Sequence, residues 1–196
     1  MREHLIAEGD DVLSRVVVGR NLDDHIIEAA SHSGARRVAV LCQPNTRNLA
    51  EYYANGMAMA GLEAGGYTLP DSEEAKQKGV VEEVYRYLNA QRFTRSDLIV
   101  GVGGGALTDV AGFIGGTYLR GIRVGYVATT LVAAVDAAIG GKTGVNVDGK
   151  NLAGVFKHPD TVMVDIDILD ELPIAQKVEG AAEAVKTGFI EDAGII

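Results

Sequence analysis

The chain has 196 residues and a formal net charge of −9, and 47% of its residues are hydrophobic while 23% are charged. This length suits one large domain, or one domain and part of another, and the composition excludes a disordered chain. The acidic balance argues against a nucleic-acid partner, whose phosphates need a basic face. A single cysteine, Cys42, excludes an internal disulfide and any cysteine-based zinc knuckle.

Neither the first residues nor the apolar stretches predict secretion or a membrane span. Glu3 stands where a signal peptide would carry a basic and then an apolar stretch. The most apolar stretch, residues 124–135, contains two threonines and stops at Asp136, short of the ~20 apolar residues that a membrane span needs. We therefore expect a protein of the reducing cytoplasm with no membrane partner.

Apolar runs alternate with helix-like segments along the chain. Strands are predicted at residues 16–18, 37–42, 67–69, 97–102, 122–127 and 162–164. Helices are predicted at residues 23–33, with Asn21 as the cap, at 45–62, at 73–88, and from Pro173 to about 190. This alternation predicts an α/β fold with a doubly wound parallel sheet, which binds its ligand beyond the carboxyl ends of its strands.

Three consecutive glycines follow the predicted strand at residues 97–102. Gly103, Gly104 and Gly105 let backbone N–H groups approach a diphosphate at the positive end of the next helix. They do not form the spaced G-x-G-x-x-G pattern, so a plain tight turn is an equal alternative. Asp109, four residues on, either reaches a ribose or nicotinamide-side group or merely complements the helix dipole.

Polar residues concentrate between residues 136 and 151, within otherwise apolar sequence. An acid, two lysines and two asparagines occur there: Asp136, Lys142, Asn146, Lys150 and Asn151. Buried charges are costly unless paired, so a polar ligand explains the cluster better than packing does. A P-loop is excluded, because the first glycine of its G-x-x-x-x-G-K pattern would have to stand at position 136, which is Asp136.

Six motifs in this order resemble those of the dehydroquinate synthase family. They are Gly-Gly-Gly-Ala-Leu-Thr-Asp-Val-Ala-Gly-Phe, Thr-Tyr-Leu-Arg-Gly-Ile, Thr-Thr-Leu-Val-Ala-Ala-Val-Asp, Gly-Gly-Lys-Thr-Gly-Val-Asn, Gly-Lys-Asn-Leu-Ala-Gly-Val-Phe and Glu-Gly-Ala-Ala-Glu-Ala-Val-Lys. The resemblance implies a Rossmann-like NAD-binding domain over residues 1–170. It also implies that residues 171–196 begin a mostly helical domain that supplies a divalent metal, zinc or cobalt.

The family is one of carbon–oxygen lyases acting on phosphates in the shikimate pathway of aromatic amino acid biosynthesis. Its members convert 3-deoxy-D-arabino-heptulosonate 7-phosphate to 3-dehydroquinate and phosphate. The reaction passes through transient oxidation, phosphate elimination, reduction, ring opening and aldol closure, and NAD is regenerated in each turn. The resemblance therefore implies a sugar-phosphate substrate and a cyclised product.

The same resemblance implies the cofactor-binding residues. Residues 70–76 are similar to the family's P-x-G-E-x-x-K, in which the Glu and Lys bind the adenosine ribose, although Ser72 replaces the glycine. The implied NAD ligands are Glu73, Lys76, Gly103, Gly104, Gly105, Asp109, Thr129, Thr130, Lys142 and Lys150. Without the resemblance, Glu73 and Lys76 read as a solvated helix pair, and no ribose contact is assigned within Gln43-Pro44-Asn45.

The substrate and metal residues are carried over in the same way. Asp136, Lys142, Lys150, Asn151 and Lys186 are implied to surround the substrate. Arg120 matches an arginine that reaches the substrate phosphate across a dimer interface, which implies a homodimer. Glu183 is the implied metal ligand, three residues before Lys186 on one helix face, although such a pair is more often a surface ion pair.

A catalytic zinc site needs three protein ligands, and Glu183 alone is matched. The four histidines of the chain do not match the family's metal ligands. We therefore expect an incomplete fragment that lacks most of the helical domain and is inactive alone.

Three alternatives remain open. Another sugar-phosphate cyclase, of the 2-deoxy-scyllo-inosose or 2-epi-5-epi-valiolone synthase type, shares the NAD half and is distinguished by its product. A metal-dependent polyol or alcohol dehydrogenase is related in fold, but is not expected to contain Lys142, Lys150 and Asn151 together. A non-catalytic NAD-binding or dimerising module would bind NAD without turnover.

Overall fold

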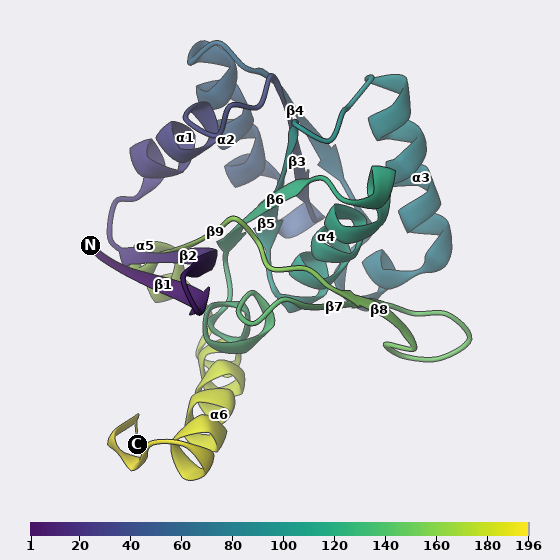
Figure 1. Cartoon of the computed structure of the whole chain (residues 1–196). Coiled ribbons are helices and arrows are strands. Elements are labelled where there is room, and N and C mark those ends of the chain that lie inside the picture. The colour runs from purple at the N-terminus through teal and green to yellow at the C-terminus, as the bar shows by residue number, and fades with distance from the viewer. Residues whose placement is uncertain (196) are drawn as a thin grey trace.

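A computed structural model, which describes residues 1–195, shows a seven-stranded sheet with helices on both faces (Figure 1). The strand order is β1-β2-β9-β6-β5-β3-β4, and all neighbours are parallel except β1 and β2. These strands are β1 (Arg2–Glu8), β2 (Asp11–Gly19), β3 (Arg37–Cys42), β4 (Glu63–Thr68), β5 (Leu98–Gly103), β6 (Arg123–Ala128) and β9 (Thr161–Asp165). The predicted α/β class with a parallel sheet is confirmed.

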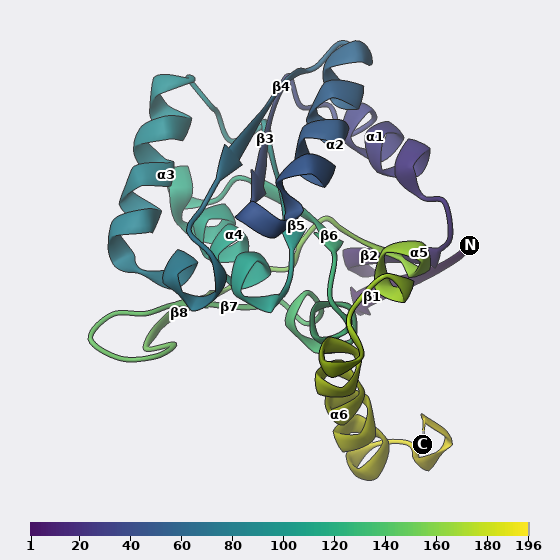
Figure 2. The same cartoon turned by 180° about the vertical axis from the view of Figure 1, so that it is seen from behind.

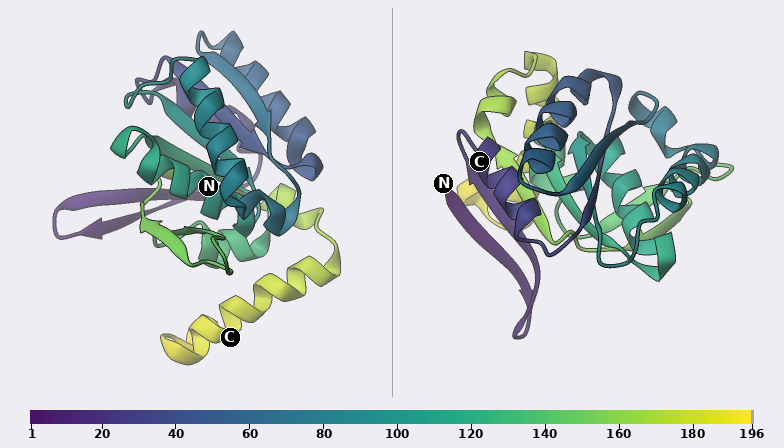
Figure 3. Two further views of the ribbon diagram at one scale, coloured as in Figure 1. Left: turned by 90° about the vertical axis from the view of Figure 1, so that its right-hand side faces the viewer. Right: turned by 90° about the horizontal axis from the view of Figure 1, so that it is seen from above.

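The helices divide between the two faces of the sheet, as Figure 3 shows from two further directions. On one face lie α1 (Asp23–Ser31) and α2 (Arg47–Met59), and on the other lie α3 (Lys78–Ala90) and α4 (Gly105–Thr117). The remaining helices are α5 (Ile166–Asp170), α6 (Ile174–Ile190) and the short turns η1 (Pro44–Thr46), η2 (Ser72–Lys76), η3 (Tyr118–Arg120), η4 (Ala133–Ala137) and η5 (Ala193–Ile195).

Alternate residues of β3 face the two helix layers, because successive strand side chains point to opposite faces. Val38 and Val40 pack with the α1 and α2 side chains, while Ala39 and Leu41 pack with those of α3 and α4. All four are fully buried. A continuously apolar strand is therefore what this central position requires, and each buried Val or Leu contributes ~1.5–3 kcal/mol.

Two predicted features are wrong in detail. Asn21 does not cap α1: its backbone is left-handed, with φ 53°, and Asp165 accepts the Leu22 N–H at 2.7 Å instead. The helix predicted at residues 73–88 is broken at Gln77, whose backbone is extended between η2 and α3. The break turns the end of η2 toward the molecule, where the Asn146 N–H donates to the Lys76 carbonyl at 2.8 Å.

Two strand pairs were not anticipated from the sequence. The exposed strand β1 forms a hairpin with β2, and β7 (Lys142–Val145) pairs with β8 (Ala153–Phe156) as a separate antiparallel ribbon. Figure 1 shows the loop between β7 and β8 reaching outward on the α3 side. Only β2 among these four strands was recognised from an apolar run, at residues 16–18, and β1, β7 and β8 lack such a run.

The helix predicted from Pro173 is confirmed as α6, which projects from the carboxyl side of the sheet (Figure 2). Several of its apolar side chains are exposed: Ile174, Val178, Val185, Phe189 and Ile190. In residues 1–195, no helix has both the length and the apolar character needed to cross a membrane.

Candidate functional site

The glycine turn lies at the carboxyl end of β5, a central strand flanked by β6 and β3. The Thr129 N–H donates to the Gly103 carbonyl at 3.0 Å, and a Cβ on Gly104 would lie 3.0 Å from Thr130. The ends of β5 and β6 are thus in contact, and a side chain added at Gly104 would crowd Thr130. The first turn of α4 has no side-chain cap. Its Leu107 N–H donates to the Gly104 carbonyl at 3.1 Å, and the N–H groups of Gly105 and Ala106, which precede it, remain for a ligand. This geometry fits a diphosphate.

Lys76 is buried, with 1% of its surface exposed. Its Nζ donates to Asp109 Oδ2 at 2.7 Å and also to Asn151 Oδ1. The alternative of a solvated Glu73–Lys76 helix pair therefore does not hold for Lys76. Burial raises the pKa of Asp109 above its usual value, and the hydrogen bond from Lys76 opposes that shift.

Beside this pair lies a cavity of about 370 Å³. Its lining comes from α4, η4, β7 and the loops around them, and consists of Asp109, Asp136, Ala137, Ile139, Lys142, Thr143, Gly144 and Asn151. Four of these residues, Asp109, Asp136, Lys142 and Asn151, were predicted site residues. Two carboxylates, an ammonium and a carboxamide around one cavity suit a ligand that carries hydroxyl and anionic groups.

The loop between β7 and β8 is fastened to η2 by Asn146. The Asn146 side chain accepts the Asn151 N–H at 2.9 Å and donates to Glu73 at 3.4 Å. The sequence placed Asn146 in the polar cluster, but no role was predicted for it. Its position at the end of the Gly-Gly-Lys-Thr-Gly-Val-Asn motif is the sequence signal that could have indicated one. It determines where Asn151 lies.

Lys150 and Glu73 lie outside this cavity. The Lys150 side chain is 68% exposed and its Nζ lies 3.5 Å from a Glu73 carboxylate oxygen. An exposed pair of this kind contributes ~0–1 kcal/mol and leaves both groups free to exchange partners. Their predicted contacts with NAD and substrate stay predictions.

The segment that follows β3, Gln43-Pro44-Asn45, was assigned no ribose contact, and in the structure Gln43 has a structural role. Gln43 is buried, and its Nε2 donates at 3.0 Å to both the Pro70 and the Ser72 carbonyl oxygens. Thr46 Oγ1 donates to the Val102 carbonyl at 2.9 Å. Gln43 thus holds the loop that carries Glu73 against the end of β3.

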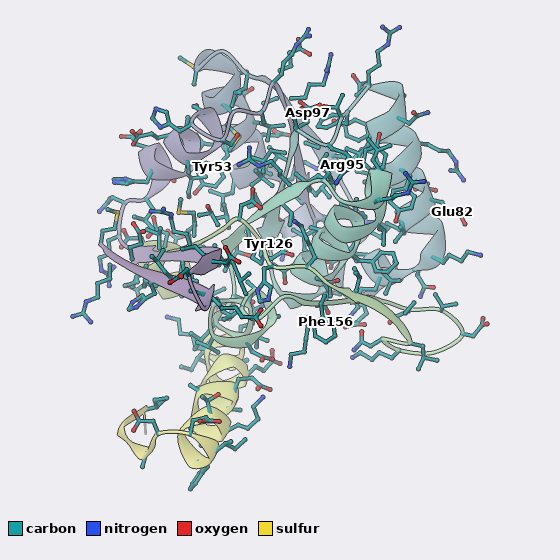
Figure 4. All side chains as sticks on the ribbon, in the orientation of Figure 1. Tyr53, Glu82, Arg95, Asp97, Tyr126 and Phe156 are labelled. Atoms are coloured by element: carbon teal, nitrogen blue, oxygen red, sulfur yellow. The ribbon has the colours of Figure 1, made fainter. Side chains whose placement is uncertain are left out.

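Arg120 lies apart from the cavity in a separate shallow hollow of about 660 Å³. Arg95, Lys157 and Phe156 also line this hollow, and Figure 4 labels Arg95 and Phe156. Arg120 has a left-handed backbone, with φ 65°, at the end of η3. The structure therefore does not bring Arg120 to the other predicted substrate residues within one chain.

Glu183 and Lys186 form an ion pair with each other on α6. The pKa of Lys186 is raised, first by its hydrogen bond to Glu183 and to a smaller extent by the charge of Asp136. In the part of the chain that is described, no three His, Cys, Asp or Glu side chains gather as a metal site would require. The residues present therefore do not hold a metal by themselves, and Glu183 stays a candidate ligand.

Comparison with known proteins identifies a family. The model of the 3-dehydroquinate synthase N-terminal family matches residues 66–179. The chain is 43% identical over 182 residues to the 3-dehydroquinate synthase of Corynebacterium glutamicum (strain R), which covers 92% of this chain and 50% of that protein. The chain thus spans about half the length of the curated relatives it matches.

Two solved cyclases have the same fold over most of the chain. A 2-deoxy-scyllo-inosose synthase, solved with carbaglucose-6-phosphate, NAD+ and Co2+, matches with a TM-score of 0.84 and 27% identity, covering 95% of this chain and 52% of that one. A 2-epi-5-epi-valiolone synthase from Streptomyces hygroscopicus subsp. jinggangensis 5008, with NAD+ and Zn2+ bound, matches with a TM-score of 0.83 and 28% identity, covering 96% and 53%.

Proposed function

Because the chain belongs to the 3-dehydroquinate synthase N-terminal family, we propose that it carries the NAD-binding part of a 3-dehydroquinate synthase. The proposed reaction is the cyclisation of 3-deoxy-D-arabino-heptulosonate 7-phosphate to 3-dehydroquinate with loss of phosphate. The observation that carries the proposal is the cavity beside the glycine turn, where Asp136, Lys142 and Asn151 converge with Asp109.

The glycine turn and the strand ends are proposed to bind the cofactor. Gly103, Gly104 and Gly105 would hold the diphosphate with the N–H groups of α4, and Thr129 and Thr130 would contact the adjacent part of NAD. NAD, when bound, supplies reversible hydride acceptance. Asp109 would orient the cofactor, and Glu73 and Lys150 at the rim would contact it where they are exposed.

The cavity residues would then orient the substrate. Lys142 would donate to an anionic or hydroxyl oxygen and stabilise negative charge that develops there, because a cation in a partly enclosed site acts more strongly than in water. Asp136 would accept a proton in a hydrogen bond from a substrate hydroxyl. Asn151 would hold a further substrate oxygen. Lys186 would approach the substrate from α6, and the charge of Asp136 already acts on the Lys186 ammonium group.

The division of the chain is part of this proposal. Residues 1–170 would form the NAD-binding domain and residues 171–196 would begin a helical domain that supplies a divalent metal, zinc or cobalt, with Glu183 as one ligand. The exposed apolar side chains of α6 support this, because such a surface normally packs against more protein. A homodimer, with Arg120 acting in the partner's site, is proposed on the resemblance alone, and a cytoplasmic location is proposed on the single cysteine.

The cofactor proposal is tested by calorimetric titration of the chain with NAD. Asp109→Ala should remove a ligand contact, and Gly104→Val should place atoms against Thr130 and close the diphosphate approach. Gly79→Ala is the matched control, because an added Cβ there meets no atom within 4 Å. Loss of binding in both variants but not in the control supports the proposal. Full binding by Gly104→Val would refute it.

A second cyclase activity is favoured by the structural neighbours, two of which make 2-deoxy-scyllo-inosose or 2-epi-5-epi-valiolone. Both are less similar in sequence than the 3-dehydroquinate synthases, at 27% and 28% against 43% identity. Product analysis by the whole protein separates the candidates, since one forms 3-dehydroquinate and the others form 2-deoxy-scyllo-inosose or 2-epi-5-epi-valiolone. Net production of NADH from a polyol would instead indicate a dehydrogenase.

A further inference from the structure

A second cavity, of about 560 Å³, lies between α1 and the sheet, and we refer to it as the α1 cavity. Its walls come mainly from α1 on one side and from β2, β5, β6 and β9 on the other. It lies on the α1 and α2 face of the sheet and shares no lining residue with the cavity beside the glycine turn, to which α4 contributes. Its volume is within the range of small-molecule sites.

Small residues on both walls leave this space open. Gly125 lies in the middle of β6 and faces α1, because its neighbour two positions on, Val127, packs with the α1 and α2 side chains. An added Cβ on Gly125 would have only the Thr161 carbonyl oxygen within 4 Å, at 3.4 Å, and no side chain. The facing helix contributes Ala29 and Ala30 to the lining. A glycine inside a strand often marks the close approach of a ligand.

The helix that covers the cavity is fastened to the sheet at both ends. At its start, Asp165 of β9 accepts the Leu22 N–H at 2.7 Å. After its end, the Arg123 guanidinium of β6 donates to the Ser33 carbonyl. The helix cannot settle onto the sheet without breaking these hydrogen bonds, so the cavity is already formed before a ligand enters.

The charged side chains that line the cavity do not favour an anionic ligand. Arg123 lies 2.8 Å from Asp160, and Arg15 is paired with Glu3. Both guanidinium groups in the lining therefore already have a carboxylate partner, and Glu28 adds a third carboxylate. An anion would have to displace one of these carboxylates and would be repelled by the others. An uncharged ligand leaves the pairs intact.

The apolar part of the lining favours an aromatic ligand. Three of the four methionines of the chain line the cavity: Met1, Met57 and Met163. Thioether sulfurs are polarisable and make favourable contacts with aromatic rings. The planar guanidinium groups of Arg15 and Arg123 can also stack on an aromatic face while they keep their carboxylate partners.

We propose that the α1 cavity is a binding site for a small, uncharged aromatic molecule. The ligand lies over Gly125, against the Met163 thioether, and α1 covers it. The site is separate from the one proposed for NAD and substrate. It rests on the contacts of α1 with the sheet, so it does not depend on the proposed function.

The first test titrates the chain with N-phenyl-1-naphthylamine, an uncharged aromatic amine whose fluorescence rises in apolar surroundings. We expect saturable binding of one probe molecule per chain. Gly125→Val fills the floor of the cavity and should weaken binding about tenfold or more. The matched control is Gly66→Val in the edge strand β4, because an added Cβ there meets only the Val40 carbonyl oxygen, at 4.0 Å. Equal binding by Gly125→Val and Gly66→Val would overturn the inference.

Urea unfolding checks that the Gly125→Val chain is folded. We expect it to be at least as stable as the unmodified chain, because valine suits a strand and fills open space. If it does not fold, Ala29→Leu closes the cavity from the α1 side and takes its place in the titration.

Two further titrations examine the charge of the ligand and the location of the probe. The 8-sulfonate of the same probe carries a negative charge, and we expect it to bind at least about tenfold more weakly. Equal or tighter binding of the sulfonate would overturn the inference. Exposed Phe189 on α6 is the competing apolar surface, so the titration is repeated with Phe189→Ser. Binding that is lost in Phe189→Ser and kept in Gly125→Val would also overturn it.

The methionine methyl groups report directly on where the probe lies. The methyl signals of methionine-labelled chain are recorded by NMR during the titration, and Met163→Leu assigns the Met163 signal. We expect the ring of the probe to shift the Met163 and Met57 signals, because both side chains line the cavity. Met59, which is 91% exposed and does not line it, is the internal control and should not shift. A Met163 signal that stays unchanged at saturation would overturn the inference.

Discussion

Gly112 in α4 lies where the helix contacts both the sheet and the cavity wall. A Cβ at this position would lie 2.3 Å from the Tyr126 hydroxyl oxygen and 2.3 Å from Thr143 Cγ2. Tyr126 belongs to the central strand β6 and is labelled in Figure 4. Thr143 belongs to β7, which also carries Lys142. We therefore predict that Gly112→Ala displaces β7 more than β6 and moves Lys142 with it.

The magnitude follows from two opposing terms. Overpacking of a well-filled site costs ~1–3 kcal/mol, whereas replacing glycine by alanine inside a helix stabilises by ~1 kcal/mol. We expect Gly112→Ala to be net destabilising by about 1–2 kcal/mol, because two contacts are violated together. For a chain of this size, that corresponds to a fall in Tm of roughly 2–8 °C.

Thermal and urea unfolding followed by circular dichroism measure this effect. The control is again Gly79→Ala in α3, for which the helix term acts alone and the stability should rise. Adding Thr143→Ser and Tyr126→Phe to Gly112→Ala removes both contacting atoms, and we expect these changes to restore part of the loss. Equal stability of Gly112→Ala and Gly79→Ala would refute the packing argument.

Two further predictions concern charged groups. Asp97 is buried, and burial alone raises the pKa of its carboxyl group. The backbone N–H donors of Thr94 and Arg37 outweigh this effect and lower the pKa below its usual value. The ionised Asp97 therefore stabilises the fold above about pH 4, and this stabilisation is lost as the pH falls through the lowered pKa. Asp97→Asn should cost about 1–3 kcal/mol at neutral pH and flatten the acid limb of the stability curve, and an unchanged acid limb, compared with the exposed Asp10→Asn, would contradict this. Lys150→Ala should change unfolding stability by less than about 0.5 kcal/mol, because its partner Glu73 is exposed, and a loss above about 1 kcal/mol in the same melts would show that the pair is more than a surface contact.

The sheet was predictable because its strands are buried on both faces. β3 and β5 are continuous apolar runs, and the glycines after β5 mark the strand end where a ligand approaches. The hairpin strand β1 was missed because every residue in it except Ile6 is exposed, so it has no apolar pattern. The cap of α1 was assigned wrongly because Asp165, the residue that accepts the Leu22 N–H, is 143 residues away in the sequence.

The candidate site shows a more general limit of sequence reasoning. Lys142 and Lys150 are two lysines in one polar cluster, and spacing alone treats them alike. The structure separates them because the intervening loop contains Asp148, with φ 53°, and ends at Asn151, with φ 57°. These left-handed residues reverse the chain, so that Asn151 returns to Lys76 while Lys150 points outward. Which lysine faces the cavity thus depends on the hydrogen bond between Lys76 and Asn151, two residues 75 positions apart. No local sequence pattern contains that information.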